Sequence, residues 1–226
     1  MRELADGLWV VEVPLRGFGV EVGRRMTVVR LDGDALLLHS PAPLTGEVRA
    51  SLLGAGRPRF VVAPSLVHGH RFMEDYRAVF DGVELLAAPG LDRRRKDLAF
   101  DGVLGSVPDP RWGAHLDQEV FLGSWVPEVV FLHRASGTLV VGDLAIGVDP
   151  AAVTSPLARA AWRAEGVHGR IAMPRSFRLV TRNRRAARAS LRRILAWEFD
   201  RLVLGHGPVV ESGGRAAFER AVRPLL

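Results

Sequence analysis

The stretch Arg59–Tyr76 reads RFVVAPSLVHGHRFMEDY. An apolar run typical of a buried strand ends in a short loop that contains His68, Gly69 and His70, and two acidic residues follow. Two imidazoles at a strand end indicate either a metal site or two histidines that only bond to the backbone or cap the next helix. The choice depends on which other side chains the fold brings to this loop.

The composition limits both the class of protein and the kind of metal site. With 226 residues, of which 48% are hydrophobic, the chain is long enough for one well-buried core, and we expect a single domain over 1–226. Cysteine is absent, so that any metal must be held by His, Asp or Glu. The apolar runs are too short for a signal peptide or a membrane span, and we expect a cytoplasmic protein with no membrane partner.

The positive charge is concentrated in one segment. The net charge is +6, and residues 174–199 contain eight arginines. Such a segment is either the solvated face of an amphipathic helix or a surface that binds phosphate groups, as in nucleic-acid binders. Aromatic residues do not alternate with the arginines, which favours the solvated face. We therefore expect a small and preferably anionic molecule as the partner, with nucleic acid as the alternative.

Strand and helix patterns alternate along the chain. Residues 7–15 and the segments on either side of Asp32-Gly33-Asp34 are rich in β-branched and apolar residues and predict hairpin strands. Further strands are predicted at 59–65, 83–90, 117–123, 127–133, 138–144 and 200–210, and helices at 45–56, 72–82, from 156 onward, 184–199 and 214–226. Leu157, Ala161 and Trp162 are expected to share one helix face. Hairpins followed by alternating strands and helices predict a mixed α/β architecture.

Polar side chains follow three of the predicted strands directly. His68 and His70 follow RFVVAP, Asp143 lies in TLVVGDL, and His206 lies in RLVLGHG. In α/β folds, ligand sites lie in the loops beyond the carboxyl ends of strands. Imidazole and carboxylate ligands together suit zinc, iron or manganese. The candidate metal ligands are therefore His68, His70, Asp143 and His206.

The order of these elements resembles the metallo-β-lactamase fold superfamily. TLVVGDL is similar to the Gly-Asp element of that family, and LVLGHGPVV is similar to its final Gly-His element. The resemblance implies an αββα sandwich of two mixed β-sheets flanked by helices. It looks most like an uncharacterised branch with a degenerate metal motif.

The sequence departs from the family motif H-x-H-x-D-H in the loop after RFVVAP. If the strand ends coincide, only His68 stands at a ligand position, and His70 is displaced by one residue. If His68 and His70 are instead the first two histidines, the next two ligand positions fall on Phe72 and Met73, which cannot bind a metal. Ser124 stands near the place of the family's lone histidine. The resemblance therefore implies one metal ion, not two.

Three hypotheses follow for the function. The first is a metal-dependent hydrolase in which one divalent ion activates water and His68 and Asp143 are the catalytic residues. We expect the ion to be zinc, with iron or manganese as alternatives. The second is a metal-free pseudoenzyme with a binding or scaffold role. The third is a nucleic-acid binder that uses the arginines of residues 175–193.

The remaining histidines and acids have simpler interpretations. We expect His39 to be a structural residue near the mouth of the site and His133 to be exposed beside a turn. His115 and His168 lie in predicted loops. Glu74 and Asp75 suit the first turn of a helix, where the helix dipole favours acids. Ala88–Asp97, which follows a strand and contains four basic residues, could bind an anion.

Overall fold

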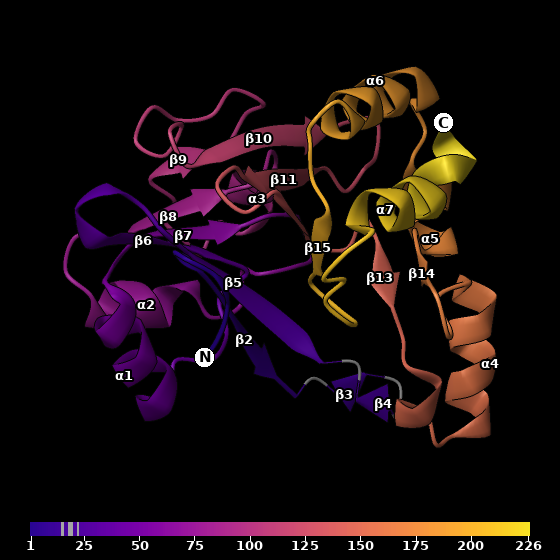
Figure 1. Ribbon diagram of the computed structural model, residues 1–226, viewed down its shortest axis with the longest axis horizontal. Coiled ribbons are helices and arrows are strands. Elements are labelled where there is room, and N and C mark those ends of the chain that lie inside the picture. The colour runs from indigo at the N-terminus through magenta and orange to yellow at the C-terminus, as the bar shows by residue number, and fades with distance from the viewer. Residues whose placement is uncertain (15, 18–19, 22) are drawn as a thin grey trace.

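The apolar runs of the sequence form two large sheets that lie face to face (Figure 1). The computed structural model describes residues 1–14, 16–17, 20–21 and 23–226, so the end of the predicted strand at Leu15 lies outside the described residues. In strand order, the larger sheet contains β1 (Arg2–Ala5), β2 (Leu8–Val13), β5 (Arg24–Arg30), β6 (Ala35–His39), β7 (Arg57–Ala63), β8 (Glu84–Ala87) and β9 (Gly102–Val103). The smaller sheet contains β10 (Leu116–Phe121), β11 (Glu128–His133), β12 (Thr138–Val141) and β15 (Arg201–Leu204).

Two short pairs of antiparallel strands and the helices complete the described structure. β3 (Arg16–Gly17) pairs with β4 (Val20–Glu21), and β13 (Ile146–Gly147) pairs with β14 (Ile171–Ala172). The α-helices are α1 (Gly46–Ala55), α2 (Met73–Val79), α3 (Leu91–Arg94), α4 (Pro156–Glu165), α5 (Arg175–Val180), α6 (Arg184–Leu195) and α7 (Gly214–Val222). Short 3-10 turns lie at η1 (Asp32–Asp34), η2 (Pro150–Ala152) and η3 (Arg223–Leu225). Among these described helices, none has the length and apolar composition needed to cross a membrane.

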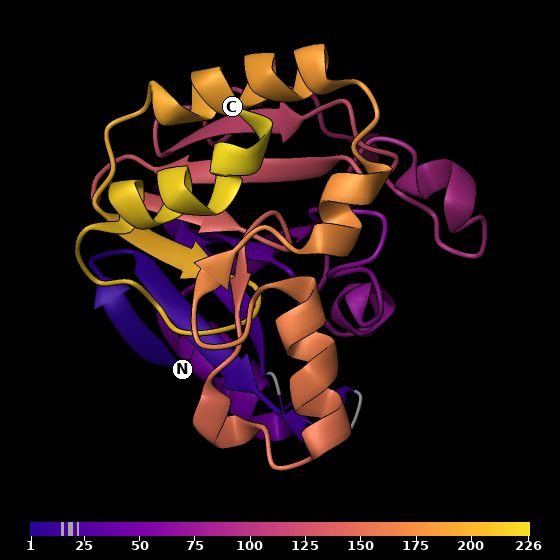
Figure 2. The ribbon, with the colours of Figure 1, turned by 90° about the vertical axis from the view of Figure 1, so that its right-hand side faces the viewer.

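Helices cover the outer face of each sheet. α1 and α2 contact β7 of the larger sheet, while α6 contacts β10 and α7 contacts β15 of the smaller sheet. Figure 2 shows α6 and α7 along the outer side of the smaller sheet. Three apolar clusters fill the layers: Phe60, Trp112 and Phe131 between the sheets, Leu52 and Met73 under α1 and α2, and Leu191 and Phe218 under α6 and α7. This arrangement confirms the predicted αββα sandwich of two mixed sheets.

The parallel direction of β12 and β15 brings the residues that follow these two strands to the same edge of the smaller sheet. β6, β7 and β8 run parallel in the larger sheet, and β12 runs parallel to β15 in the smaller one. Val141 and Leu204 are partners in the β12–β15 register. Asp143 and His206 each follow two residues after these partners, so the topology alone brings them to the same place.

Most predicted elements are present, with differences among the helices, of which one is that α3 lies in the segment predicted to be an anion-binding loop. Thr45 caps α1 as expected, since its hydroxyl accepts the N–H of Val48 at 3.2 Å. α6 ends at Leu195, before the predicted end at residue 199, because Trp197 and Phe199 pack against the core as the chain turns into β15. The packed face of α4 was also predicted wrongly. Leu157 is 82% exposed, whereas Ala158 is buried and Trp162 packs beside it against a small cluster around β13.

Arg25 joins the two sheets at the end where the strands meet. Its guanidinium donates to the carbonyl oxygens of Leu204 at 2.5 Å and Gly207 at 2.8 Å, and to the carboxylate of Glu12 at 2.8 Å. The Arg25 side chain is 7% exposed, whereas the Glu12 side chain is 55% exposed. The two carbonyl bonds therefore matter more for stability than the ion pair, which water screens.

We expect Arg25→Met to lower the free energy of unfolding by about 2–5 kcal/mol, because it leaves two carbonyls without a donor at roughly 1–3 kcal/mol each. The matched control is Glu12→Gln, which removes only the half-exposed ion pair and should cost under about 1 kcal/mol. Urea denaturation of both variants measures the difference. Equal losses would show that the carbonyl bonds do not join the sheets.

Candidate metal centre

His68 enters the protein interior through a tight turn after β7. The hydroxyl of Ser65 accepts the backbone N–H of His68 at 3.1 Å, which turns the chain back toward the sheets. Gly69 has a φ of +82°, and a Cβ at this position would lie 2.8 Å from Pro64 Cδ and 3.0 Å from Ser40 Cα. The turn therefore requires glycine. As a result, the His68 side chain is only 3% exposed.

Asp143 is held in place by a buried carboxylate on the neighbouring strand. The Glu128 side chain accepts the backbone N–H groups of Gly142 at 2.8 Å, Asp143 at 2.7 Å and Leu144 at 2.9 Å. Three donors on one carboxylate fix the loop after β12. The Asp143 side chain then points back toward the site and is 19% exposed.

His206 follows β15, and one hydrogen bond fixes the tautomer of its imidazole ring. Its Nδ1 lies 2.6 Å from the carbonyl oxygen of Gly23. A carbonyl oxygen can only accept, so Nδ1 bears the hydrogen, and in the neutral ring Nε2 keeps its lone pair. That nitrogen lies 3.4 Å from Oδ1 of Asp143.

The three side chains converge on one point. Oδ1 of Asp143 is 3.4 Å from Nδ1 of His68 and 3.4 Å from Nε2 of His206. One ligand atom from each of the three residues lies within 4.8 Å of the other two. The two imidazole rings are 4.9 Å apart and nearly perpendicular, at 85°. The sequence places these residues 63 or more positions apart, and the fold brings them together.

The donor set and its spacing fit a metal ion. Both 3.4 Å contacts are longer than an ordinary N–H···O hydrogen bond, which spans about 2.7–3.2 Å. Ligand atoms at the corners of a tetrahedron with bonds of about 2.0–2.1 Å are roughly 3.3–3.4 Å apart. Two imidazoles and a carboxylate are also a common ligand set for zinc and for non-haem iron. The side chains therefore have the chemistry for one ion, and two of their three separations match such a site, while the third lies within 4.8 Å.

Close backbone packing supports the same geometry. A Cβ on Gly205 would lie 2.9 Å from the Gly142 carbonyl oxygen and 3.0 Å from the His68 ring. Glycine at this position lets the His68 ring lie directly against the strand end that leads to His206. The Nε2 atom of His68 is buried, and it has no hydrogen-bond partner within the described structure. The ring is thus packed in place rather than held by the hydrogen bonds typical of a structural histidine.

The charges in the centre suit metal binding near neutral pH. Burial opposes ionisation of Asp143, but His68, His206 and Arg24 together lower its pKa to about 2. Burial also lowers the pKa of His206, although Asp143 acts in the opposite direction. At pH 7 the centre therefore presents a carboxylate beside a neutral imidazole, the forms that bind a metal.

Glu128 is the residue of the centre that sequence reasoning did not identify. It is fully buried, and burial followed by the Asp143 charge raises its pKa, while the three N–H donors, which bond best to the ionised form, act in the opposite direction. Its only signal in the sequence is an acid at the start of the apolar run EVVFLH. A buried acid is costly unless it is hydrogen-bonded, so an acid at this place in a buried strand is itself a signal of a fixed polar arrangement.

His70 does not join the cluster. Its Nδ1 accepts a hydrogen bond from Nη1 of Arg95 at 2.6 Å, and Arg95 also pairs with Asp97 at 2.7 Å. Of the two possible alignments of the loop, the structure matches the one in which His68 alone stands at a ligand position. The structure brings together His68, Asp143 and His206, and it turns His70 toward Arg95.

His39 lies buried near the centre. It is 2% exposed, its ring meets Phe131 edge-on with centroids 5.8 Å apart, and burial, followed by His68, lowers its pKa to about 3. It is therefore a neutral ring. Its Nε2 has no hydrogen-bond partner in the chain as described.

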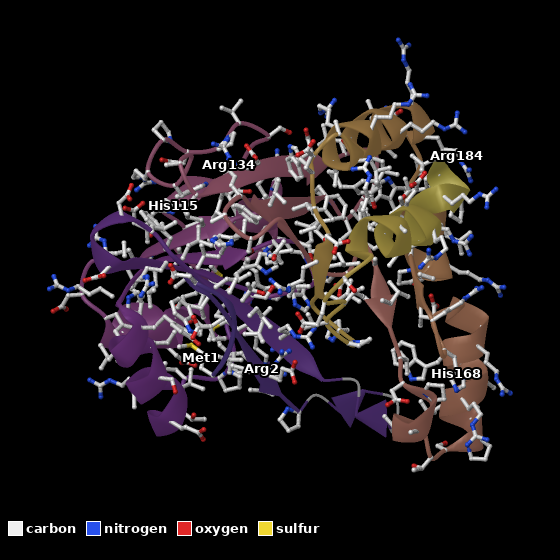
Figure 3. The ribbon with its side chains drawn as sticks, viewed as in Figure 1. Met1, Arg2, His115, Arg134, His168 and Arg184 are labelled. Atoms are coloured by element: carbon white, nitrogen blue, oxygen red, sulfur yellow. The ribbon has the colours of Figure 1, made fainter. Side chains whose placement is uncertain are left out.

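The other histidines lie outside the centre. The expectation that His133 is exposed is wrong, because the turn after β11 folds over it: the residue is 2% exposed, and its Nδ1 lies 2.7 Å from the Ser136 hydroxyl. Figure 3 shows His115 and His168 at opposite margins of the molecule. His115 lies just before the start of β10, where its Nε2 is 3.0 Å from Oδ1 of Asp32. The strand register puts this position beside the start of β12, whereas Asp143 follows the end of β12.

Comparison with known proteins gives matches of structure but not of sequence. No family model and no curated protein matches the chain. A metallo-β-lactamase from Erythrobacter litoralis is 16% identical with a TM-score of 0.68, and the match covers 99% of this chain and 94% of that one. A metallo-β-lactamase from Pseudomonas aeruginosa in its mono-zinc form is 14% identical with a TM-score of 0.62, over 99% and 93% of the two chains.

A second kind of protein shares the fold. A variant flavo di-iron protein from Thermotoga maritima is 13% identical with a TM-score of 0.66, and the match covers the whole of this chain but 62% of that one. Identities this low establish the arrangement of the chain and not its activity. Both kinds of neighbour share the αββα layers described above. The chain has the metallo-β-lactamase fold, in a divergent form that no family model matches.

Proposed function

We propose that the protein is a metal-dependent hydrolase that holds one divalent ion with His68, Asp143 and His206. The observation that supports this proposal is the 3.4 Å spacing of one carboxylate oxygen from two imidazole nitrogens on three separate loops. Three protein ligands leave a coordination position open, as catalytic zinc sites do. Zinc is our first choice of metal, with iron or manganese as alternatives, since the fold neighbours include a mono-zinc lactamase and a di-iron protein.

When bound, such an ion supplies hydroxide near neutral pH and polarises a carbonyl or phosphoryl oxygen. The residues of this chain would hold and orient it. Asp143 stays ionised between the two rings and offers a full negative charge. The Gly23 carbonyl fixes the His206 tautomer so that Nε2 faces the centre. Glu128 would hold the Asp143 loop in place by accepting three of its backbone N–H groups.

Two rival functions have weaker support. A metal-free pseudoenzyme would need the same loops without their ligand chemistry, and metal analysis separates it from our proposal. For the nucleic-acid hypothesis, α6 buries Leu191 and Ile194 and turns its arginines to solvent, as an ordinary surface helix does. Two of those arginines are occupied, Arg188 by the Leu225 carbonyl and Arg193 by Glu119. We therefore propose a small molecule as the partner.

Metal content is the direct test of the proposal. We expect the protein, expressed without a histidine tag, to contain near one equivalent of zinc, iron or manganese per chain. His206→Ala should lose that metal, because it removes one of three ligands. His70→Ala is the matched control and should retain it, because His70 faces Arg95. Elemental mass spectrometry of the three proteins gives the answer.

The possible outcomes separate the hypotheses. Negligible metal in the wild type, even after incubation with each ion, would favour the pseudoenzyme. Loss of metal in His70→Ala as well would return His70 to the ligand set and contradict the geometry described above.

Glu128→Gln should weaken metal binding by about 10–100-fold, the usual cost of removing a group that orients a ligand. Both carboxylate oxygens of Glu128 accept a backbone N–H, so the amide NH₂ of glutamine would place a donor against a donor in either orientation. The control is Glu119→Gln, which alters another buried acid on the adjacent strand β10, one that pairs with Arg193. Competition with a chelating dye measures the affinity. Similar losses in both variants would indicate general destabilisation and not a role for Glu128 in positioning Asp143.

A further inference from the structure

Arg24 is a half-buried cation beside the metal centre, and it forms no ion pair with the side chains that the structure describes. It begins β5, directly after Gly23, whose carbonyl holds His206. Its guanidinium lies over the ring of Phe72, 5.4 Å from the centroid. Its Nε is buried, and no partner for it exists among the described residues. Burial, and then Arg71, lowers the pKa of Arg24, while Asp143 acts in the opposite direction. A buried donor of this kind is costly unless a ligand meets it.

Arg71 places a second guanidinium on the same ring. Its Cζ lies 5.8 Å from the Phe72 centroid, so that two cations share one aromatic side chain. One cation–π contact stabilises each of them modestly, but the two like charges repel. An anion between them would remove that repulsion. Arg71 is exposed, and the position is therefore open to solvent on one side.

His70 adds a neutral hydrogen-bond donor beside these two arginines. We call Arg24, Arg71 and His70 together the basic rim. Because its Nδ1 accepts from Arg95, the hydrogen of the neutral ring is on Nε2. The loop that follows β7 thus offers an N–H group next to guanidinium groups.

Arg24 borders both the metal centre and a cavity. Arg24 directly follows Gly23, whose carbonyl oxygen lies 2.6 Å from Nδ1 of His206. A cavity of about 750 Å³ is lined by Gly23 and Arg24 and also by Gly205 and Gly207, which flank His206. This volume is within the usual range for a small-molecule site.

We propose that Arg24, Arg71 and His70 bind a phosphate group of the substrate beside the metal centre. The inference rests on the proposed function, since the substrate is the molecule that the metal centre would hydrolyse. A phosphate group has up to two negative charges and several acceptor oxygens, and it can bond to two guanidinium groups at once. A carboxylate has one charge and would leave the second guanidinium unmatched.

Binding of inorganic phosphate to the full chain, freed of metal with a chelator, tests this inference. Isothermal titration should show saturable binding to the wild type. We expect at least a tenfold loss of affinity in Arg24→Met and in Arg71→Met, which remove the charge but keep most of the apolar stem. Arg184→Met is the matched control, since Arg184 is exposed at the start of α6, near the upper right of Figure 3, and should bind as the wild type does. Acetate should bind at least tenfold more weakly than phosphate.

Several results would overturn the inference. These are phosphate binding that is unchanged in both rim variants, an equal loss in Arg184→Met, and no saturable binding to the folded wild type. Circular dichroism checks that each variant is folded, and the exposed Arg71→Met still tests the inference if Arg24→Met does not fold. Because the chain is metal-free in this experiment, its outcome is separate from that of the metal analysis. A chain that binds metal but not phosphate would keep the proposed function and lose this inference.

Discussion

The buried carboxylate of Glu128 is the constraint on which the rest of the site depends. Its oxygens hold the loop that presents Asp143, and its own backbone pairs with Ser65, at the turn that presents His68. The next residue, Val129, donates its N–H to the Pro64 carbonyl at 2.8 Å. One strand end thus positions two loops from different sheets. Burying an acid this deeply is unfavourable, and the three N–H bonds offset that cost only while the loop keeps its shape.

The third loop, which carries His206, is held by hydrogen bonds from Arg25 and by close contact between backbones. Arg25 bonds to the carbonyls of Leu204 and Gly207 and so anchors the turn around His206 to the larger sheet. Gly207 has a φ of +106°, and a Cβ there would lie 2.5 Å from the Gly147 carbonyl oxygen. With no room for a side chain at Gly207, the backbones of these segments pack directly against each other, and the three candidate ligand atoms lie within 4.8 Å of one another.

The sequence allowed the layers and three of the cluster residues to be predicted, because both depend on local pattern. Apolar runs identified the strands, and a polar residue after a strand end identified His68, Asp143 and His206. The orientation of His70 could not be predicted, since it depends on Arg95, 25 residues further on, and on the turn that Ser65 and Gly69 set. Glu128 looked like one residue of a strand, because only the folded structure shows three N–H groups aimed at it.

The departure from the family motif and the basic rim are best understood as one change. In a His-x-His loop both imidazoles can serve a pair of ions, but here the second ring faces a guanidinium. Arg24, Arg71 and Arg95 lie where a second cation would be repelled, and each unit charge at a few ångströms raises the cost of placing one there. The same charges attract an anion. Under the proposed function, a site with one ion and several arginines would hold no second metal and would instead recognise a negatively charged substrate electrostatically.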